Sequence, residues 1–184
     1  MSNLLTFTSK IIIGIVIIAI PSFFLFSEAE PTPKTIPIDK KYSDEEVSCL
    51  AHNIYFESRN ESTAGQLGVA DVTLNRVYSE KYPNTICGVI MDGPHYTNWR
   101  GIEIPIKNKC QFSWYCDGKN DSVKDSEKYV EIYLLANDIL NGGYELFDIT
   151  DGAMHYHADY VNPSWASSMV RTSKIDTHIF YRLK

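Results

Sequence analysis

Residues 11–26 form a run of sixteen residues without a charged side chain, between Lys10 and Glu28. As a helix rising about 1.5 Å per residue, this run would span about 24 Å, less than the roughly 30 Å hydrocarbon core of a bilayer. A retained anchor would therefore need flanking residues or local thinning of the membrane. A cleaved signal peptide needs neither, and residues 27–29 supply small side chains for cleavage. We predict an export segment at residues 1–29, with cleavage favoured over a retained transmembrane signal anchor.

The charges around the apolar run set its orientation. Lys10 precedes the run and Glu28 and Glu30 follow it, so the positive-inside rule places the rest of the chain outside the cytoplasm. Residues 30–42 hold three prolines and mixed charges, which is typical of an extended linker. Residues 43–184 then suffice for one compact domain, in the periplasm or cell envelope, either released or held at the membrane by the apolar run.

The net charge of the chain argues against a nucleic-acid partner. The formal net charge is −6, which disfavours binding to a phosphate backbone. We expect no nucleic-acid partner and a monomeric protein.

Four cysteines are an even number in a chain addressed to an oxidising compartment, where thiols pair. They are Cys49, Cys87, Cys110 and Cys116. Three connectivities are possible; the short spacing of Cys110 and Cys116 suits a local bridge, which would leave Cys49 with Cys87. A zinc site is the alternative, but the short CxxC ligand spacing is missing.

A helix is predicted to begin at Ser43, which has the spacing of a capping box with Glu46. Four apolar residues then recur at spacings of three and four along one face: Val47, Leu50, Ala51 and Ile54. Glu57 falls at the edge of this face, among the apolar and aromatic residues of the segment NIYFESRNE. A carboxyl group against an apolar wall tends to keep its proton and can donate it to a leaving group, as in glycosidases. The alternative is an exposed helix glutamate, the commoner fate of a single Glu.

A second helix is predicted after Ser62 or Thr63, with an apolar face and with Gln66 and Asn75 elsewhere on its surface. The two helices would form a hairpin, in which Asn60 tolerates a left-handed turn better than most residues.

Residues 82–118 are rich in glycine and proline and predict loops and short strands. Within them, the segment QFSWY between two cysteines suits the presentation of aromatic rings beside a cleft, where sugars stack. The alternative is that Phe112 and Trp114 fill the core from one face of a strand, and for Phe112 this is the favoured interpretation.

Residues 122–141 predict a third helix, with Val130, Tyr133, Leu134 and Asn137 along one stripe. After it, alternation in the extended segment His155-Tyr156-His157 would place both histidines on one side. This pattern fits a metal pair or a substrate-facing edge, but a metal site is not favoured because no clear third ligand follows before His178.

Five ordered segments carry a family resemblance. They are residues 49–77 (CLAHNIYFESRNESTAGQLGVADVTLNRV), 83–89 (PNTICGV), 110–118 (CQFSWYCDG), 154–165 (MHYHADYVNPSW) and 175–182 (IDTHIFYR). Together they resemble the cell wall hydrolase family that includes the SleB-type spore cortex-lytic enzymes. The resemblance implies a lysozyme-like α+β domain, mainly α, with a small β-hairpin or sheet element, that cleaves the glycan strands of peptidoglycan.

In the family pattern the first Glu is the catalytic acid and corresponds to Glu57, and the second corresponds to Glu61. Asn60 and Asp176 both stand where the family usually has glycine. The resemblance and the apolar setting of Glu57 favour a lytic transglycosylase, which cleaves the β-1,4 bond between N-acetylmuramic acid and N-acetylglucosamine with one carboxyl group, no metal and no cofactor. Residues expected to support the site or bind the glycan are Glu61, Gln66, Phe112, Ser113, Trp114, His155, Tyr156 and His157.

Several alternatives stay open at this point. One is plain hydrolysis of the same bond by a muramidase. Another is a zinc-dependent N-acetylmuramoyl-L-alanine amidase with ligands from His155, His157 and His178. A third is a peptidoglycan-binding module without catalysis. The sequence also fits either a bacterium that remodels its own wall or a phage endolysin.

Overall fold

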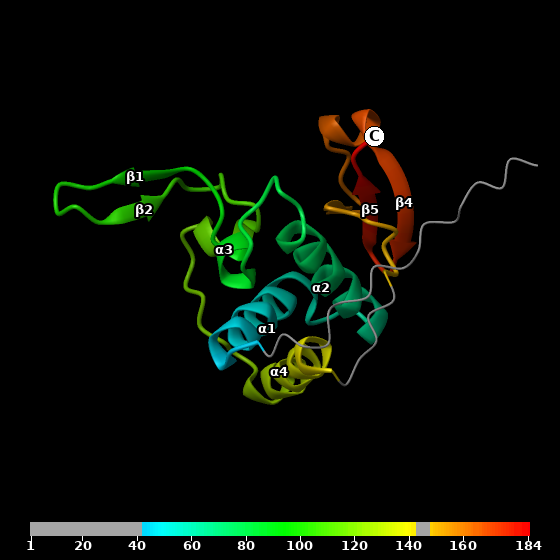
Figure 1. The fold of residues 1–184 in the computed structure, drawn as a ribbon, viewed down its shortest axis with the longest axis horizontal. Helices are drawn as coiled ribbons and strands as arrows, with labels where there is room; N and C mark the ends of the chain where they lie inside the picture. The colour runs from blue at the N-terminus through cyan, green and yellow to red at the C-terminus, as the bar shows by residue number, and fades with distance from the viewer. Residues whose placement is uncertain (1–41, 143–147) are drawn as a thin grey trace, which may run out of the picture. The chain divides into compact units, whose positions relative to one another are not determined.

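The computed structural model describes residues 42–142 and 148–184 (Figure 1). The predicted export segment and almost all of the predicted linker lie outside the described residues. Within the two described ranges, no helix combines the length and the apolar character needed to cross a membrane.

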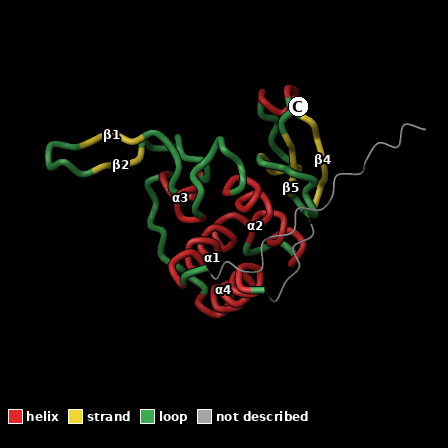
Figure 2. The backbone as a smooth tube through the Cα atoms, in the orientation of Figure 1, coloured by secondary structure: helices red, strands yellow, loops and turns green. Residues whose placement is uncertain are grey.

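Helices predominate among the described residues, and the strands are short (Figure 2). The α-helices are α1 (Asp44–Ser58), α2 (Thr63–Val77), α3 (Ile86–Ile90) and α4 (Ser126–Asn141), and the 3-10 helices are η1 (Ser113–Cys116) and η2 (Ser164–Ser168). The strands are β1 (His95–Thr97), β2 (Glu103–Pro105), β3 (His155–Ala158), β4 (Val170–Ile175) and β5 (His178–Arg182). The predicted α+β class, mainly α, is confirmed.

Only one half of the capping box predicted for Ser43 and Glu46 is formed. The Ser43 hydroxyl accepts a hydrogen bond from the Glu46 amide at 3.3 Å, so α1 begins where the sequence predicts. The Glu46 carboxylate does not return to Ser43; its Oε2 accepts from the Ile86 amide at 2.8 Å. Glu46 therefore fixes the first turn of α3 against α1.

The predicted face of α1 forms the centre of the main core. Val47, Leu50, Ala51 and Ile54 are fully buried, and α1 contacts α2, α3 and α4. The stripe predicted on α4 is wrong, because Val130 and Leu134 are 56% and 58% exposed. Its buried face is Ile132, Ala136, Ile139 and Leu140. Apolar residues occupy both faces of α4, so periodicity alone could not identify the face that packs.

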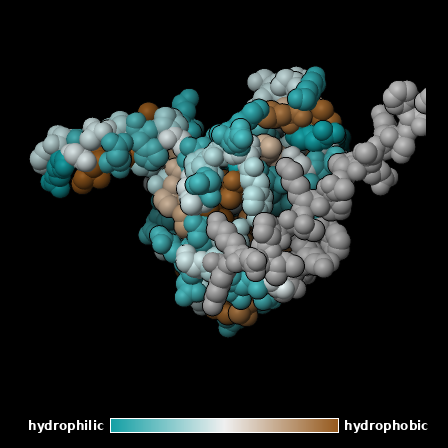
Figure 3. All heavy atoms as spheres, viewed as in Figure 1, coloured by the Kyte–Doolittle hydropathy of each residue, from teal (hydrophilic) through white to brown (hydrophobic). Residues whose placement is uncertain are grey.

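The C-terminal sheet is antiparallel with strand order β3-β5-β4. Phe180 of β5 is fully buried, and its ring approaches α2 so closely that a Cβ atom on Gly68 would lie 2.7 Å from Phe180 Cζ. A glycine at this position of α2 is what allows the sheet to pack there. The β1–β2 hairpin forms a separate two-stranded sheet and exposes apolar side chains (Figure 3).

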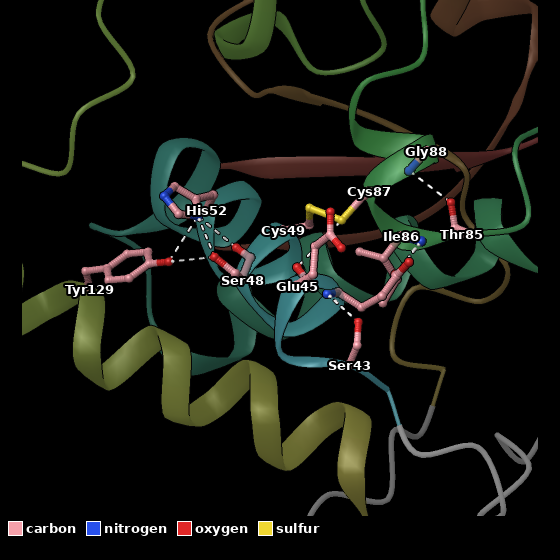
Figure 4. The surroundings of a disulfide bond; sticks show 11 residues. Ser43, Glu45, Ser48, Cys49, His52, Thr85, Ile86, Cys87, Gly88 and Tyr129 are labelled. Carbon is pink, nitrogen blue, oxygen red and sulfur yellow. Dashed lines mark hydrogen bonds between the residues drawn. A yellow bond between two sulfur atoms is a disulfide. The ribbon is translucent and has the colours of Figure 1, made fainter.

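Two disulfides join the cysteines as the spacing favoured. Cys49 pairs with Cys87, which links α1 to α3 (Figure 4), and Cys110 pairs with Cys116 around η1. The segment between Cys110 and Cys116 contains a 3-10 helix rather than the strand considered from the sequence. Phe112 is nevertheless a core residue, 2% exposed.

The link between α1 and α2 also differs from the prediction. Asn60 is not among the residues with positive φ, and the reversal is closed instead by a hydrogen bond from the Glu61 amide to the Ser58 carbonyl at 3.0 Å. A left-handed residue occurs in the β4–β5 turn, where Asp176 has φ +48°.

Candidate active site

Glu57 lies in the last turn of α1, and its side chain is partly buried. Its Oε2 accepts a hydrogen bond of 2.8 Å from the hydroxyl of Tyr156, in β3. The Tyr156 ring packs edge-on against His178 with centroids 5.0 Å apart, and at 5.7 Å from Phe180. The sheet therefore holds the tyrosine in place to orient the Glu57 carboxyl group.

A buried positive charge also belongs to this site. Arg76 of α2 is only 4% exposed; its Nε donates to the Met154 carbonyl at 2.9 Å, and its guanidinium lies over the Phe112 ring at 4.7 Å. Its Nη1 is buried and has no hydrogen-bond partner among the described residues. Arg76 was not predicted from the sequence, because α2 is buried on most of its surface, beyond the apolar face that periodicity identifies.

The environment raises the pKa of Glu57. Burial is the main cause, and it outweighs the Tyr156 hydrogen bond and the Arg76 charge, which both favour the carboxylate. Burial also raises the pKa of Tyr156 well above its usual range, so this phenol remains a hydrogen-bond donor. The site can thus keep a proton on Glu57 and can also stabilise the carboxylate after that proton has left.

Glu61 has a different environment from Glu57. Its Oε1 accepts from the Thr177 hydroxyl at 2.6 Å. In return, Asp176 Oδ2 accepts from the Ser62 amide at 2.9 Å and from the Ser62 hydroxyl at 2.6 Å. These reciprocal contacts fasten the β4–β5 turn to the start of α2. A Cβ atom on Gly65 would lie 2.6 Å from Asp176 Oδ2, so the glycine makes room for this carboxylate.

An aromatic cluster adjoins Glu57 on α1. Trp114 stacks on Phe56 with centroids 4.7 Å apart, and its Nε1 donates to Asn53 Oδ1 at 2.9 Å. Asn53 is itself fully buried and donates to Thr73 at 3.0 Å. These contacts hold the Trp114 ring against α1 at Asn53 and Phe56, which precede Glu57 in the same helix.

Two other predicted site residues, Gln66 and Ser113, do not join the aromatic cluster of Trp114 and Phe56. Gln66 is buried rather than on the helix surface, and its amide donates to the Glu61 carbonyl at 3.4 Å. Ser113 is exposed at the start of η1.

His155 and His157 lie on one side of β3, as the alternation predicts. Both rings face Trp165, at 5.7 and 5.6 Å between centroids. His178 pairs with Ala158 in the register, which puts it on the opposite face of the sheet, beside Tyr156. The three histidines do not converge, and the described residues contain no group of three or more His, Cys, Asp or Glu placed to hold a metal ion.

Comparison with known proteins agrees with this architecture. The cell wall hydrolase family matches residues 60–181, a stretch that begins just after Glu57. The spore cortex-lytic enzyme of Bacillus cereus is 30% identical over 151 residues, which are 82% of this chain and 49% of that protein. The Bacillus subtilis enzyme of the same name is 24% identical over 140 residues, covering 76% of this chain and 38% of that protein. The chain thus spans about half the length of these relatives or less.

Two solved structures are also similar. The crystal structure of the catalytic domain of the Bacillus cereus SleB protein has a TM-score of 0.54 at 30% identity, and the match covers 80% of this chain and 95% of that one. The catalytic domain of the germination-specific lytic transglycosylase SleB from Bacillus anthracis gives the same TM-score and identity, covering 80% of this chain and all (100%) of that one. By family match, sequence identity and fold, the chain belongs to the cell wall hydrolase family.

Proposed function

We propose that the chain is an exported lytic transglycosylase that cleaves the β-1,4 bond between N-acetylmuramic acid and N-acetylglucosamine in peptidoglycan. The observation that carries this proposal is the setting of Glu57, a carboxyl group with a raised pKa and a hydrogen bond from a partly buried tyrosine. A general acid needs its proton at the working pH, and burial supplies that condition.

A single carboxyl group is enough for this reaction. Protonated Glu57 gives its proton to the glycosidic oxygen as the bond from that oxygen to C1 of the muramic acid breaks. The resulting carboxylate then takes the proton of the muramic acid 6-hydroxyl, whose oxygen bonds to C1 and forms the anhydro ring. Tyr156 and the Arg76 charge stabilise the carboxylate between the two steps.

The contacts of Glu61 support one carboxyl group over two. A retaining or inverting hydrolase needs a second carboxylate as nucleophile or base. Glu61 accepts hydrogen bonds from the Thr177 hydroxyl and, at 3.4 Å, from the Thr177 amide, so it is engaged in holding the β4–β5 turn.

Export completes the proposal. Peptidoglycan lies outside the cytoplasm, and the predicted export segment at residues 1–29 would bring the domain to it. The relatives named as spore cortex-lytic enzymes and the neighbour named as a lytic transglycosylase support the choice of substrate and reaction.

Glu57→Gln is the decisive variant, because it keeps the shape of the side chain and removes the acid. We expect release of soluble fragments from purified peptidoglycan to fall by about 10²- to 10⁴-fold, the usual contribution of a general acid. Glu61→Gln is the matched control and should keep activity within about 10-fold of the parent, as expected for a group outside proton transfer. Near-full activity of a folded Glu57→Gln protein would refute the assignment.

Mass spectrometry of the released fragments identifies the reaction. Anhydromuramic ends are expected from a lytic transglycosylase. Reducing muramic ends would instead show hydrolysis, and free stem peptides would show an amidase.

A further inference from the structure

A pocket beside α1 lies apart from the Glu57 carboxyl group. Its volume is about 360 Å³, and Glu57 is not among the residues that line it. Its apolar lining comes from Ile90, Met91, Trp114 and Tyr115, and its acidic lining from Glu45 and Asp121. Figure 4 shows the α1 side of this region, where Glu45, Ser48, Cys49 and His52 follow one another along the helix.

The imidazole in the pocket offers an acceptor. His52 Nδ1 lies 2.8 Å from the Ser48 carbonyl, and a carbonyl can only accept, so Nδ1 carries the proton. The Tyr129 hydroxyl lies 3.0 Å from the same nitrogen. In the neutral ring Nε2 then holds a lone pair, and it forms no hydrogen bond with the described residues.

The two carboxylates are acceptors as well, and the part of the chain that the structure describes supplies no ion-pair partner to either. No ion pair within residues 42–142 and 148–184 includes Glu45 or Asp121, and neither a lysine nor an arginine lines the pocket. Asp121 is an exposed residue; desolvation and the nearby Asp117 raise the pKa of its carboxyl group, and the closeness of His52 lowers it.

Rigid aromatic rings form the remaining wall. Trp114 is held by the Asn53 hydrogen bond and by stacking on Phe56, and Tyr115 meets it edge-on with centroids 6.2 Å apart. Aromatic faces attract ammonium groups and also bury the methylene stem of a lysine-like side chain. The walls therefore suit a ligand with an apolar stem and a cationic head.

We propose that this pocket binds a primary alkylammonium side chain of a peptide. An ammonium group has three donors and no acceptor, which complements the acceptor groups that line the pocket. A neutral sugar would leave the charges of the two carboxylates uncompensated, whereas an ammonium group offsets them. If the proposed function holds, the ligand is the free amine of the diamino acid in an uncrosslinked stem peptide, next to the glycan that Glu57 cleaves.

The binding test does not depend on catalysis. The probe is acetyl-Ala-Lys-Ala-amide, titrated into the intact chain while the indole N–H signal of Trp114 is followed by NMR. The control probe, acetyl-Ala-norleucine-Ala-amide, has a similar apolar stem without the charge. We expect a saturable shift with the lysine probe and binding at least about 5-fold weaker with norleucine, because the cation contributes through carboxylates and ring faces.

A matched pair of variants locates the site. Asp121→Asn should weaken binding of the lysine probe by about 2- to 5-fold, the range for a partly exposed ion pair. Asp138→Asn makes the same chemical change at an exposed position on α4 outside the pocket and should leave binding unchanged. Unchanged binding after Asp121→Asn, equal binding of the two peptides, or displacement of the lysine probe by an N-acetylglucosamine oligomer would overturn the proposal.

The two proposals fail in different experiments. An active Glu57→Gln protein that still binds the lysine probe would remove only the proposed function. If Glu57→Gln is inactive and the parent protein does not bind the lysine probe, only the proposed ammonium site is refuted.

Discussion

At the scale of single residues, the chemistry of Glu57 depends on groups that pull its pKa in opposite directions. Burial raises the pKa, and the Tyr156 hydroxyl and the Arg76 charge lower it. In its proposed role of general acid, Glu57 is active while protonated, so activity should fall as the pH rises through its pKa.

Tyr156→Phe removes one of the two groups that stabilise the carboxylate. The pKa of Glu57 should rise further, and the alkaline limb of the pH–rate profile should move to higher pH while the maximal rate falls. The profile of kcat/KM against pH checks this. Tyr160→Phe is the control, because Tyr160 is 82% exposed and should leave the profile unchanged. An alkaline limb that stays in place in Tyr156→Phe would contradict the role given to this hydroxyl.

At the scale of elements, α2 is fastened at its start and near its middle to segments far along the chain. Near its start, Ser62 donates to Asp176 in the β4–β5 turn. Further along, Thr150 donates to the buried carboxyl group of Asp71 through its hydroxyl at 2.6 Å and its amide at 3.1 Å. Each attachment predicts a measurable effect on stability.

Asp176 combines an unfavourable backbone conformation with favourable hydrogen bonds from Ser62. Its φ of +48° disfavours any residue with a Cβ atom, and its carboxylate holds Ser62. Asp176→Ala loses the hydrogen bonds from Ser62 and keeps the strained backbone conformation. Asp176→Gly loses the same hydrogen bonds and relieves the strain. We expect Asp176→Ala to be less stable than Asp176→Gly by about 1 kcal/mol in urea unfolding. Equal stability of the two variants would show that the turn stores no backbone strain.

Asp71 should make stability depend on pH. Burial raises the pKa of Asp71 from 3.8 to about 7, so the folded protein holds a proton that the unfolded chain releases. The stability gained is present in full below about pH 4, declines as the pH rises and is gone above about pH 7.

Asp71→Asn should remove that decline, because the amide cannot titrate. Between pH 4.5 and 8, the Tm of the parent should fall relative to that of the variant by at least about 4 °C, since 1 kcal/mol corresponds to about 2–4 °C at this size. Thermal unfolding followed by circular dichroism measures this difference. Parallel Tm curves for the two proteins would rule out the titration of Asp71 in this range.

At the scale of the whole molecule, the two disulfides close loops of very different length. Cys49 and Cys87 are 38 residues apart, and Cys110 and Cys116 are 6 apart. On loop entropy, replacing the first pair by alanine should cost about 4 kcal/mol and replacing the second about 2 kcal/mol. Guanidinium unfolding of the two double variants checks the order, and a larger loss from the short loop would contradict the entropic account.

Much of the local structure follows from the sequence alone. The Ser43 cap, the buried face of α1 and the Cys110–Cys116 disulfide depend on spacings within a helix or on the reach of a short loop. The sequence likewise places Glu57 at the end of α1, among apolar neighbours. Such features involve residues close along the chain, and the physics that sets them is local.

The tertiary structure alone decides what surrounds Glu57. Its hydroxyl donor lies 99 residues away in Tyr156, and the group that engages Glu61 lies 116 residues away in Thr177. The burial of Arg76 and the packing face of α4 also depend on which surfaces meet. These contacts form where distant segments exclude water from each other, so the spacing of residues in the sequence does not contain them. The different roles proposed for Glu57 and Glu61 rest on these contacts.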